Sequence, residues 1–204
     1  MTMMIQDRLA AKDILDQRRS SGNDRWDEVW DGVYILMPNP NVEHQGIATN
    51  LAAIFCTILN SSDLARAYQG VNVSDQAEDW TRNYRCPDVV VGLAGGSAKN
   101  CDTHWYGGPD LVVEIASPGQ DPRDKNDFYA AVGTRGVLIV ERDPWALELF
   151  QLDGDVYHLV GRSDDTNGTV LPSSVLPLTF ALRAAAKRPE IVVTHTTTGQ
   201  AWTA

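Results

Sequence analysis

LVVEI, at residues 111–115, is an apolar run with one acid inside it, and PDVVV, at residues 87–91, is a second run of the same kind. Such runs are typical of buried strands, where an unpaired carboxylate costs free energy. The acids are Glu114 in the first run and Asp88 in the second. Hard divalent cations such as Mg²⁺ take oxygen ligands, often from one or two carboxylates. We therefore expect Asp88 and Glu114 to lie on neighbouring strands and to hold a divalent cation.

Each acid also has a purely structural interpretation. Asp88 follows Pro87, so it could be a turn residue at the start of a strand. Glu114 could pair with a buried arginine, since buried acids are often ion-paired. Either acid alone would favour these interpretations, and only the two side by side suggest a cation.

Composition limits the classes of function. The 204 residues suit one globular domain, and 43% hydrophobic residues are enough for a sizeable core. A net charge of −10 argues against broad non-specific nucleic-acid binding but allows a local basic groove. Three cysteines without paired spacing give neither a disulfide framework nor a zinc motif. No apolar run approaches a membrane span and no signal peptide is apparent, so we expect a cytoplasmic protein.

Periodicity and turn signals divide the chain into alternating elements. The dipeptide Asp31-Gly32 predicts a hairpin turn, and Asp121 with Pro122 predicts a helix start. The expected helices cover residues 5–19 (with Ile5, Leu9, Ile14 and Leu15 inward), 44–59 and 121–132. The expected strands are the hairpin within 26–37 and residues 65–74, 86–93, 111–116, 136–141, 146–152 and 155–160; residues 176–182 form a strand or short helix. This pattern predicts a mixed α/β (α+β) fold with an N-terminal helix and hairpin, in one domain over residues 1–186, followed by a loose polar tail over 187–204.

The predicted helix after Glu114 carries three polar residues at a spacing of four. Asp121, Lys125 and Tyr129 share one helix face. On that face Lys125 could reach back to the acids and orient a water or stabilise a phosphoryl transition state. The alternative is an exposed Asp121–Lys125 pair, which would be common and weak.

Two residues of the N-terminal half are further candidates. Glu28 lies between Trp26 and Trp30 in the hairpin, and it is either a third metal ligand among aromatic rings or a solvated acid on the outer face. His44 follows a loop of prolines and asparagines. It is either a helix-start residue, which the sequence favours, or part of the site.

Taken together, these motifs resemble a known family. The series consists of DEVWDGVY at 27–34, MPNP at 37–40 with His44, PDVVV at 87–91, GPDLVVEIASP at 108–118, and Asp121-x3-Lys125-x3-Tyr129. It resembles the Uma-two family of restriction-endonuclease-like proteins in the PD-(D/E)XK superfamily, over about residues 26–182. The resemblance implies a restriction-endonuclease-like domain with a mixed central sheet flanked by helices.

The resemblance also implies roles for individual residues. Asp88 and Glu114 match the two acids, and the main-chain carbonyl of Ile115 would be a further metal ligand. Glu28 matches a hairpin acid that joins the metal site. The usual lysine position is Ala116 here, and Lys125 matches a lysine moved onto the following helix.

These observations predict a Mg²⁺- or Mn²⁺-dependent endonuclease acting on DNA, in which Lys125 activates or positions the attacking water. Strands near 146–160 would leave an exposed edge, so we expect a homodimer. One rival is a non-catalytic, dimeric nucleic-acid- or protein-binding module in which the acids support the fold. Another is a small-molecule hydrolase, which the acidic charge favours and which would need a closed pocket.

Overall fold

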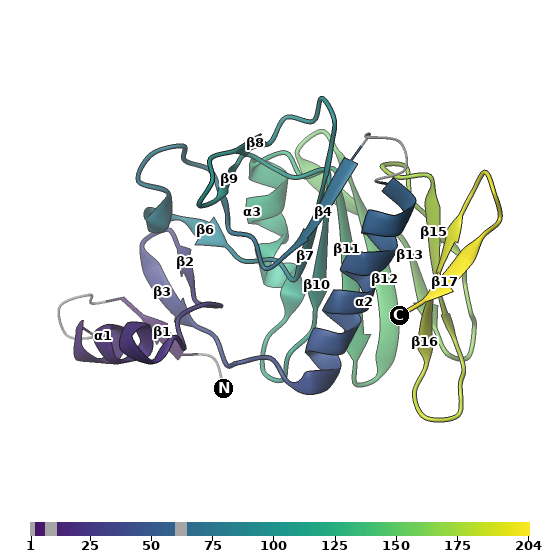
Figure 1. Cartoon of the computed structure of the whole chain (residues 1–204), viewed down its shortest axis with the longest axis horizontal. Helices are drawn as coiled ribbons and strands as arrows, with labels where there is room; N and C mark the ends of the chain where they lie inside the picture. The colour runs from purple at the N-terminus through teal and green to yellow at the C-terminus, as the bar shows by residue number, and fades with distance from the viewer. Residues whose placement is uncertain (1–2, 7–11, 60–64) are drawn as a thin grey trace.

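The computed structural model describes residues 3–6, 12–59 and 65–204, and it arranges them around three β-sheets (Figure 1). The helices are α1 (Lys12–Ser21), α2 (Val42–Leu59) and α3 (Asn126–Ala131), with 3₁₀ turns η2 (Trp80–Arg82) and η3 (Pro122–Lys125). The strands are β1 (Met3–Ile5), β2 (Glu28–Trp30), β3 (Val33–Leu36), β4 (Ala65–Gln69), β5 (Val73–Ser74), β6 (Tyr84–Arg85), β7 (Val89–Leu93), β8 (Lys99–Asn100), β9 (Trp105–Tyr106), β10 (Leu111–Ile115), β11 (Gly136–Arg142), β12 (Trp145–Asp153), β13 (Val156–Asp164), β14 (Leu171–Pro172), β15 (Leu178–Arg183), β16 (Glu190–His195) and β17 (Ala201–Thr203).

The central sheet has six strands in the order β13-β12-β11-β10-β7-β4. Strand β10 runs parallel to β11 and antiparallel to β7, so the sheet is mixed, as predicted. The two acidic runs are neighbours in it, because Val89 of β7 pairs with Val113 of β10. Glu114 lies on β10, as expected, whereas Asp88 is the residue directly before β7 rather than a residue of the strand. The two acids therefore lie at neighbouring strands, with Asp88 at a strand start.

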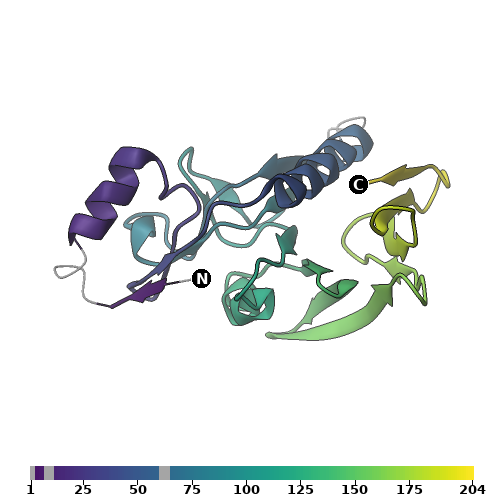
Figure 2. The same cartoon turned by 90° about the horizontal axis from the view of Figure 1, so that it is seen from below.

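Alternation along β10 decides which helix each side chain meets. Leu111, Val113 and Ile115 pack in the core against α2, whereas Val112 packs in a second core with Phe128 and Tyr129. Helices α2 and α3 lie on opposite faces of the sheet (Figure 2). Because successive side chains of a strand point to opposite faces, Glu114 lies on the side of α3.

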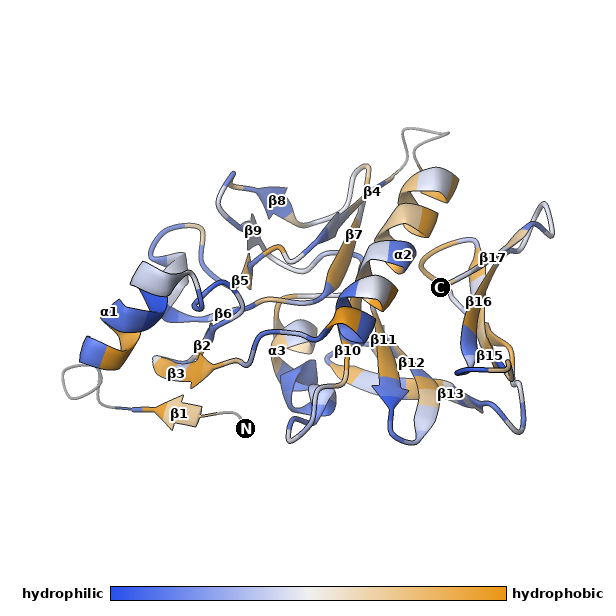
Figure 3. Cartoon of the chain, turned by 60° about the horizontal axis from the view of Figure 1, so that its bottom comes forward, coloured by the Kyte–Doolittle hydropathy of each residue, from blue (hydrophilic) through white to orange (hydrophobic). Residues whose placement is uncertain are grey.

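The predicted central helix is confirmed as α2, which begins two residues earlier than expected. The side chain of Asn41 accepts a hydrogen bond from the backbone N–H of His44 at 2.9 Å, which satisfies one of the free donors of the first turn. The predicted apolar face is buried, and it consists of Ile47, Leu51, Ile54, Phe55 and Ile58. The central strands β7 and β11 are also hydrophobic over most of their length, while α1 is largely hydrophilic (Figure 3). Among the described residues, no helix has both the length and the apolar character to span a membrane.

The predicted hairpin is confirmed as β2 and β3. Asp31 and Gly32 both have positive φ, of 49° and 85°, as a tight two-residue hairpin turn requires. The hairpin belongs to a seven-stranded sheet in the order β1-β3-β2-β6-β5-β9-β8. The expected single strand over 65–74 is wrong: Gly70, with φ +62°, breaks it into β4 and β5, which join different sheets.

The predicted N-terminal helix over residues 5–19 is wrong at its start. Ile5 lies in β1 and pairs with Tyr34 of β3, so the first residues extend the hairpin sheet. Helix α1 begins at Lys12; Leu9 lies outside the described residues. Leu15 is buried, as expected, but Ile14 is 44% exposed, because the helix presents only a narrow face to the sheet.

The helix after Glu114 begins as predicted. Asp121 accepts a hydrogen bond from the backbone N–H of Arg123 at 3.0 Å, and Pro122 occupies the first position. Its first turn, η3, is a 3₁₀ turn, and the α-helical part ends at Ala131.

The expectation of a loose tail after residue 186 is wrong. Strand β16 pairs with β15 and β17 pairs with β16, in a four-stranded sheet of order β14-β15-β16-β17. Residues 176–182 include a strand rather than a helix. Ile191 and Val193 of β16 are fully buried against the α2 core. The β-branched run Ile191-Val192-Val193 is the strand signal, which the threonine-rich stretch after it concealed.

Candidate active site

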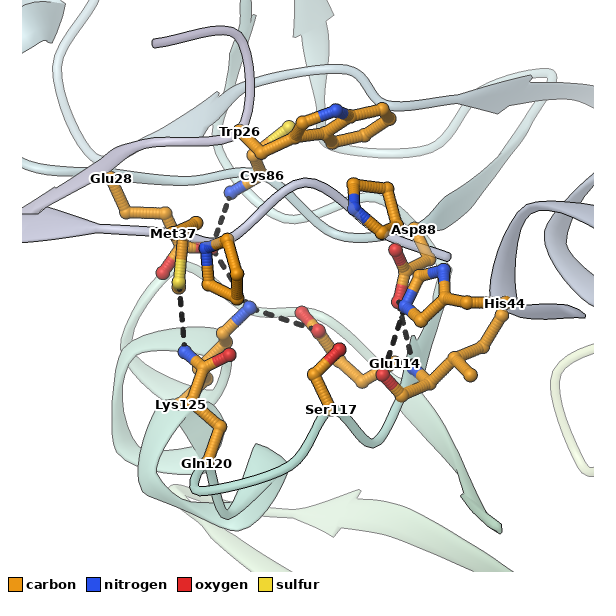
Figure 4. A pocket seen from close by; sticks show the side chains of 13 residues that line it. Trp26, Glu28, Met37, His44, Cys86, Asp88, Glu114, Ser117, Gln120 and Lys125 are labelled. Carbon is orange, nitrogen blue, oxygen red and sulfur yellow. Dashed lines mark hydrogen bonds and ion pairs between the residues drawn. The ribbon is translucent and has the colours of Figure 1, made fainter. Parts of the chain in front are cut away.

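Most of the predicted site residues converge on one pocket, to which the hairpin, α2, the start of β7, β10 and η3 contribute. We call it the acidic pocket; it is lined by Glu28, His44, Asp88, Glu114 and Lys125, among others (Figure 4). Its cavity of about 50 Å³ exceeds the roughly 10–15 Å³ that one water needs. Residues from positions 28 to 125 therefore meet in one small polar cavity, which no single motif predicts.

Asp88 is placed by the strand that follows it. Its Oδ2 accepts a hydrogen bond from the backbone N–H of Ile115 at 2.7 Å, which ties the start of β7 to the end of β10. Its Oδ1 has no hydrogen-bond partner among the described residues. Asp88 thus has the structural role considered above and still offers one carboxylate oxygen to the pocket.

Glu114 is buried, with 4% of its surface exposed, and its partner is not the arginine that the structural interpretation required. Its Oε2 accepts from the Lys125 ammonium group at 2.9 Å, and its Oε1 accepts from the Tyr129 hydroxyl. Burial raises the pKa of Glu114 to about 7; Asp88 and Glu28 push in the same direction and Lys125 opposes them. The environment of Glu114 therefore favours its protonated form at pH values where an exposed glutamate is ionised.

Lys125 joins two carboxylates. Its Nζ lies 2.8 Å from Oε1 of Glu28 and 2.9 Å from Oε2 of Glu114, and its side chain is almost fully buried. Burial alone would lower the pKa of Lys125, but the two carboxylates outweigh it and raise this pKa above its ordinary value. Lys125 is therefore a fixed cation at neutral pH.

The alternative of an exposed Asp121–Lys125 pair does not apply. Asp121 lies outside the pocket and pairs with Arg123 at 2.8 Å on the surface. Of the three residues spaced by four, Lys125 and Tyr129 reach Glu114, whereas Asp121 caps the helix. The helix turns through a 3₁₀ segment between positions 121 and 125, so the shared face begins only at Lys125.

Glu28 is buried rather than solvated, with 1% of its surface exposed. Its Oε1 accepts from the backbone N–H of Cys86 at 2.9 Å and from Lys125, and its Oε2 accepts from the Trp30 indole N–H at 2.7 Å. Both oxygens are therefore held by protein donors. In this arrangement Glu28 fixes the position of the Lys125 ammonium group.

His44 lies in the first turn of α2 and also lines the acidic pocket. Its Nε2 lies 3.1 Å from the carbonyl oxygen of Ile115 and 3.3 Å from Oδ2 of Asp88. Its Nδ1 is buried without a hydrogen-bond partner among the described residues. His44 is therefore a helix-start residue, as the sequence favoured, and its side chain also lies in the lining of the acidic pocket.

The pocket has an excess of negative charge. Three carboxyl groups (Glu28, Asp88 and Glu114) face one ammonium group, so two negative charges have no paired lysine when all three are ionised. Asp88 and the Ile115 carbonyl supply the oxygen donors that Mg²⁺ and Mn²⁺ take. Within the described chain, no three His, Cys, Asp or Glu side chains form a ready-made metal site, because the Lys125 ammonium group lies between Glu28 and Glu114. Asp88, Glu114 and the Ile115 carbonyl are the oxygen groups of the pocket from which a divalent cation would be held.

Arg85 supports the site from outside the lining of the acidic pocket, and the sequence did not predict this role. Its guanidinium group lies between the rings of Trp30 and Phe128, at 4.6 and 4.2 Å from their centroids, and donates to the Val29 carbonyl at 3.0 Å. Burial lowers the pKa of Arg85, and Glu28 opposes that shift. Arg85 thus supports the strand that carries Glu28. Its one available signal in the sequence was a charged residue two positions before the PDVVV run.

The sequence matches one family model over residues 15–185, and the description of that model is "Uma2: Putative restriction endonuclease". No curated protein matches the chain. Among solved structures, the fold is similar to a protein of Anabaena variabilis described as a "putative nuclease belonging to DUF820". The TM-score is 0.56 at 18% identity, and the match covers 72% of this chain and 80% of that one. The predicted fold class, a mixed α+β nuclease-like fold, is thereby confirmed.

Proposed function

Since the chain belongs to the Uma2 family, we propose that it is a divalent-cation-dependent endonuclease that hydrolyses phosphodiester bonds in DNA. The observation that carries this proposal is the buried Lys125 ammonium group, held between Glu28 and Glu114 beside Asp88. A structural ion pair needs one carboxylate, whereas this lysine sits in a cavity with three. A fixed cation next to a group of acids is suited to a reaction in which a phosphate gains negative charge.

Asp88, Glu114 and the main-chain carbonyl of Ile115 would hold Mg²⁺ or Mn²⁺, with His44 as an additional candidate. Such a cation lowers the pKa of bound water and offsets charge on a phosphate oxygen. Glu28 was predicted as a further ligand. Glu28 is held by the backbone N–H of Cys86 and the indole of Trp30 as well as by Lys125, whereas Glu114 accepts only from the side chains of Lys125 and Tyr129. We therefore assign Glu28 instead to positioning Lys125.

Lys125 would orient the attacking water and stabilise the charge that develops on the phosphate. It acts as a cation and not as a base, because its two carboxylate partners keep it protonated. Tyr129 fixes the Glu114 carboxylate from the other side. In this assignment Asp121 has no part in the chemistry.

The test is cleavage of plasmid and single-stranded DNA with Mg²⁺ or Mn²⁺, by the wild type and by Asp88→Ala and Lys125→Ala variants. We expect metal-dependent cleavage in the wild type and its loss in both variants. Lys12→Ala is the matched control, because Lys12 is an exposed lysine on α1 whose ion-pair partner among the described residues is Asp16, at the surface. A folded wild type that cleaves no nucleic acid with either metal would overturn the proposal.

One observation favours the rival, a non-catalytic binding module. Every carboxylate oxygen of Glu28 and Glu114 accepts a hydrogen bond from the protein, as fold-supporting acids would. Calorimetry with Mn²⁺ separates the two functions. If the protein is the endonuclease, the wild type should bind Mn²⁺ and the Asp88→Ala variant should not. If it is the binding module, neither protein should bind Mn²⁺.

The proposal includes a homodimer formed through β13, in the cytoplasm, where reducing conditions suit three free thiols. Strand β13 is an edge of the central sheet. It exposes Val156, Leu159 and Val160 by 59%, 52% and 40% of their surface, and an exposed apolar edge favours pairing with another strand. Light scattering should give a dimer for the wild type and a monomer for Leu159→Lys; a monomeric wild type would contradict this part.

A further inference from the structure

A second hollow adjoins the acidic pocket on its hairpin side. It has a volume of about 300 Å³ and is lined by Arg25, Trp26, Asn39, Pro40, Gln45 and Gln69. Trp26 and Pro40 line the acidic pocket as well, so the two spaces share a wall. We call this space the arginine hollow, and its residues take no part in the network around Lys125.

Arg25 is the free cation of this region. Its side chain is exposed and forms no ion pair among the described residues, and its guanidinium group lies 5.2 Å from the centre of the Trp26 ring. The neighbouring arginines are engaged: Arg18 pairs with Asp27 at 2.6 Å, and Arg142 donates to the carbonyl of Ala116 at 2.9 Å. In a chain of net charge −10, a polyanion needs such a local cation to approach an acidic site.

Trp26 forms a firm wall between the two spaces. Its ring lies over Gly70, where a Cβ would come within 2.9 Å of it, so the glycine leaves room for the indole. The side chain is half-buried, and it lies at the edge of the acidic pocket beside Cys86 and Asp88 (Figure 4). An indole held in this way offers a flat surface on which a base can stack.

The rest of the arginine hollow consists mainly of amide groups. Gln69 donates to the side-chain oxygen of Gln45 at 2.8 Å. The NH₂ group of Gln45 has no acceptor among the described residues. Asn39 donates to Asn23 and keeps its own carbonyl oxygen free in the same part of the structure. The hollow therefore presents both donors and acceptors beside a guanidinium group and an indole.

We propose that the arginine hollow binds the nucleotide next to the scissile phosphate in a single-stranded stretch of DNA. Arg25 contacts the backbone phosphate, and Trp26 stacks on the unpaired base. A guanidinium group suits phosphate recognition, while stacking on an aromatic ring needs a base that is free of its pair. The inference rests on the proposed endonuclease function, because that function brings the strand to the acidic pocket.

The experiment is fluorescence anisotropy of a labelled single-stranded oligonucleotide with Ca²⁺ in place of Mg²⁺, over a range of salt concentrations. Arg25→Ala should weaken binding about tenfold and should lower the slope of log K against log salt by about 0.7, the value for one phosphate contact on a single strand. Arg183→Ala is the matched control, because it removes an exposed arginine from β15, at the opposite end of the molecule from α1 (Figure 1). Circular dichroism checks the fold of each variant.

Trp26→Leu tests the stacking contact. It should weaken single-strand binding several-fold without changing the salt slope, whereas Trp26→Phe should restore most of the affinity. Equal weakening of duplex binding in the Trp26→Leu variant would overturn the assignment of an unpaired base. An unchanged affinity and slope in the Arg25→Ala variant, or an equal change in Arg183→Ala, would overturn the phosphate contact.

Cleavage of the same oligonucleotide with Mn²⁺ separates this inference from the proposed function. If the wild type binds through Arg25 but never cleaves, the endonuclease function fails and the arginine hollow stands as a binding site. If the wild type cleaves and Arg25→Ala has the same KM, the function stands and the arginine hollow is refuted.

Discussion

The Lys125 ammonium nitrogen lies 2.9 Å from Oε2 of Glu114, although the two residues belong to different elements and are separated by a strand end, a loop and a helix start. Both side chains are almost fully buried. A buried ion pair costs desolvation of both charges, and removal of one partner leaves the other charge buried and uncompensated. This contact therefore links the stability of the fold to the chemistry proposed for the acidic pocket.

Replacing Lys125 by methionine should destabilise the protein by about 3–5 kcal/mol, because it leaves Glu28 and Glu114 as buried carboxylates without their shared cation. The free energy of unfolding in urea at pH 8 measures the effect. A double variant, Lys125→Met with Glu114→Gln, should recover part of the loss, since one of the unpaired charges is removed. Lys12→Met is the matched control, and we expect no measurable change because that pair is exposed. A Lys125→Met protein as stable as the wild type would mean that the buried network contributes nothing.

Glu114 should make stability depend on pH in the absence of divalent cations. Burial raises the pKa of Glu114 from 4.5 to about 7 in the folded state. Its protonated form is therefore favoured on folding, so its contribution is complete below pH 4.5 and is lost as the pH rises through 7, by up to about 1.4 kcal/mol per pH unit. Unfolding in EDTA between pH 4.5 and 8 should show the wild type losing stability relative to Glu114→Gln. A constant difference between the two proteins would show that Glu114 is ionised throughout.

The sequence predicted the members of the site better than their partners. Asp88 and Glu114 stood out because a carboxylate in an apolar run is unusual, and strand pairing alone brings them together. The contact of Lys125 with Glu28 could not be predicted, because it depends on where the hairpin packs against α3. Asp121 was wrongly grouped with Lys125 and Tyr129 on one helix face. A spacing of four places residues on one face of an α-helix, but residues 122–125 form a 3₁₀ turn, in which this rule does not hold.

The C-terminal strands show where composition misleads. Polar threonines concealed a strand whose alternate residues complete the α2 core. Ile191→Ala should therefore destabilise the protein by about 2–4 kcal/mol, as truncation of a fully buried isoleucine does. Ile14→Ala, at an exposed isoleucine of α1, is the control and should cost far less. Thermal unfolding measures the stability of the two variants. Equal and small losses of stability would support a loose C-terminal tail after residue 186.

Cys86 should be inert to thiol reagents in the folded protein. Burial raises the pKa of the Cys86 thiol far above its ordinary value, with Glu28 acting in the same direction, and the thiolate is the reactive form. Cys101 is only half-buried. Alkylation with iodoacetamide at pH 8, mapped by mass spectrometry, should modify Cys101 well before Cys86, and denaturation should abolish the difference. Equal rates in the folded protein would mean that the acidic pocket admits the reagent freely.

Gly108, which opens the GPDLVVEIASP motif, gives the sharpest test of how β10 is positioned. A Cβ on Gly108 would lie 2.3 Å from the backbone nitrogen of Thr134 and 2.6 Å from the carbonyl carbon of Gly133. Backbone atoms cannot turn aside as a side chain can, so Gly108→Ala should push apart β10 and the turn after α3, at a cost of about 1–3 kcal/mol. Gly46 in α2 is the matched control, because its Cβ would meet nothing within 4 Å and alanine is favoured over glycine in a helix by about 1 kcal/mol. Urea unfolding should therefore give changes of opposite sign for the two Gly→Ala variants. Stabilisation by both would show that β10 and the turn can separate without loss, and that the glycine of the motif is not required for packing.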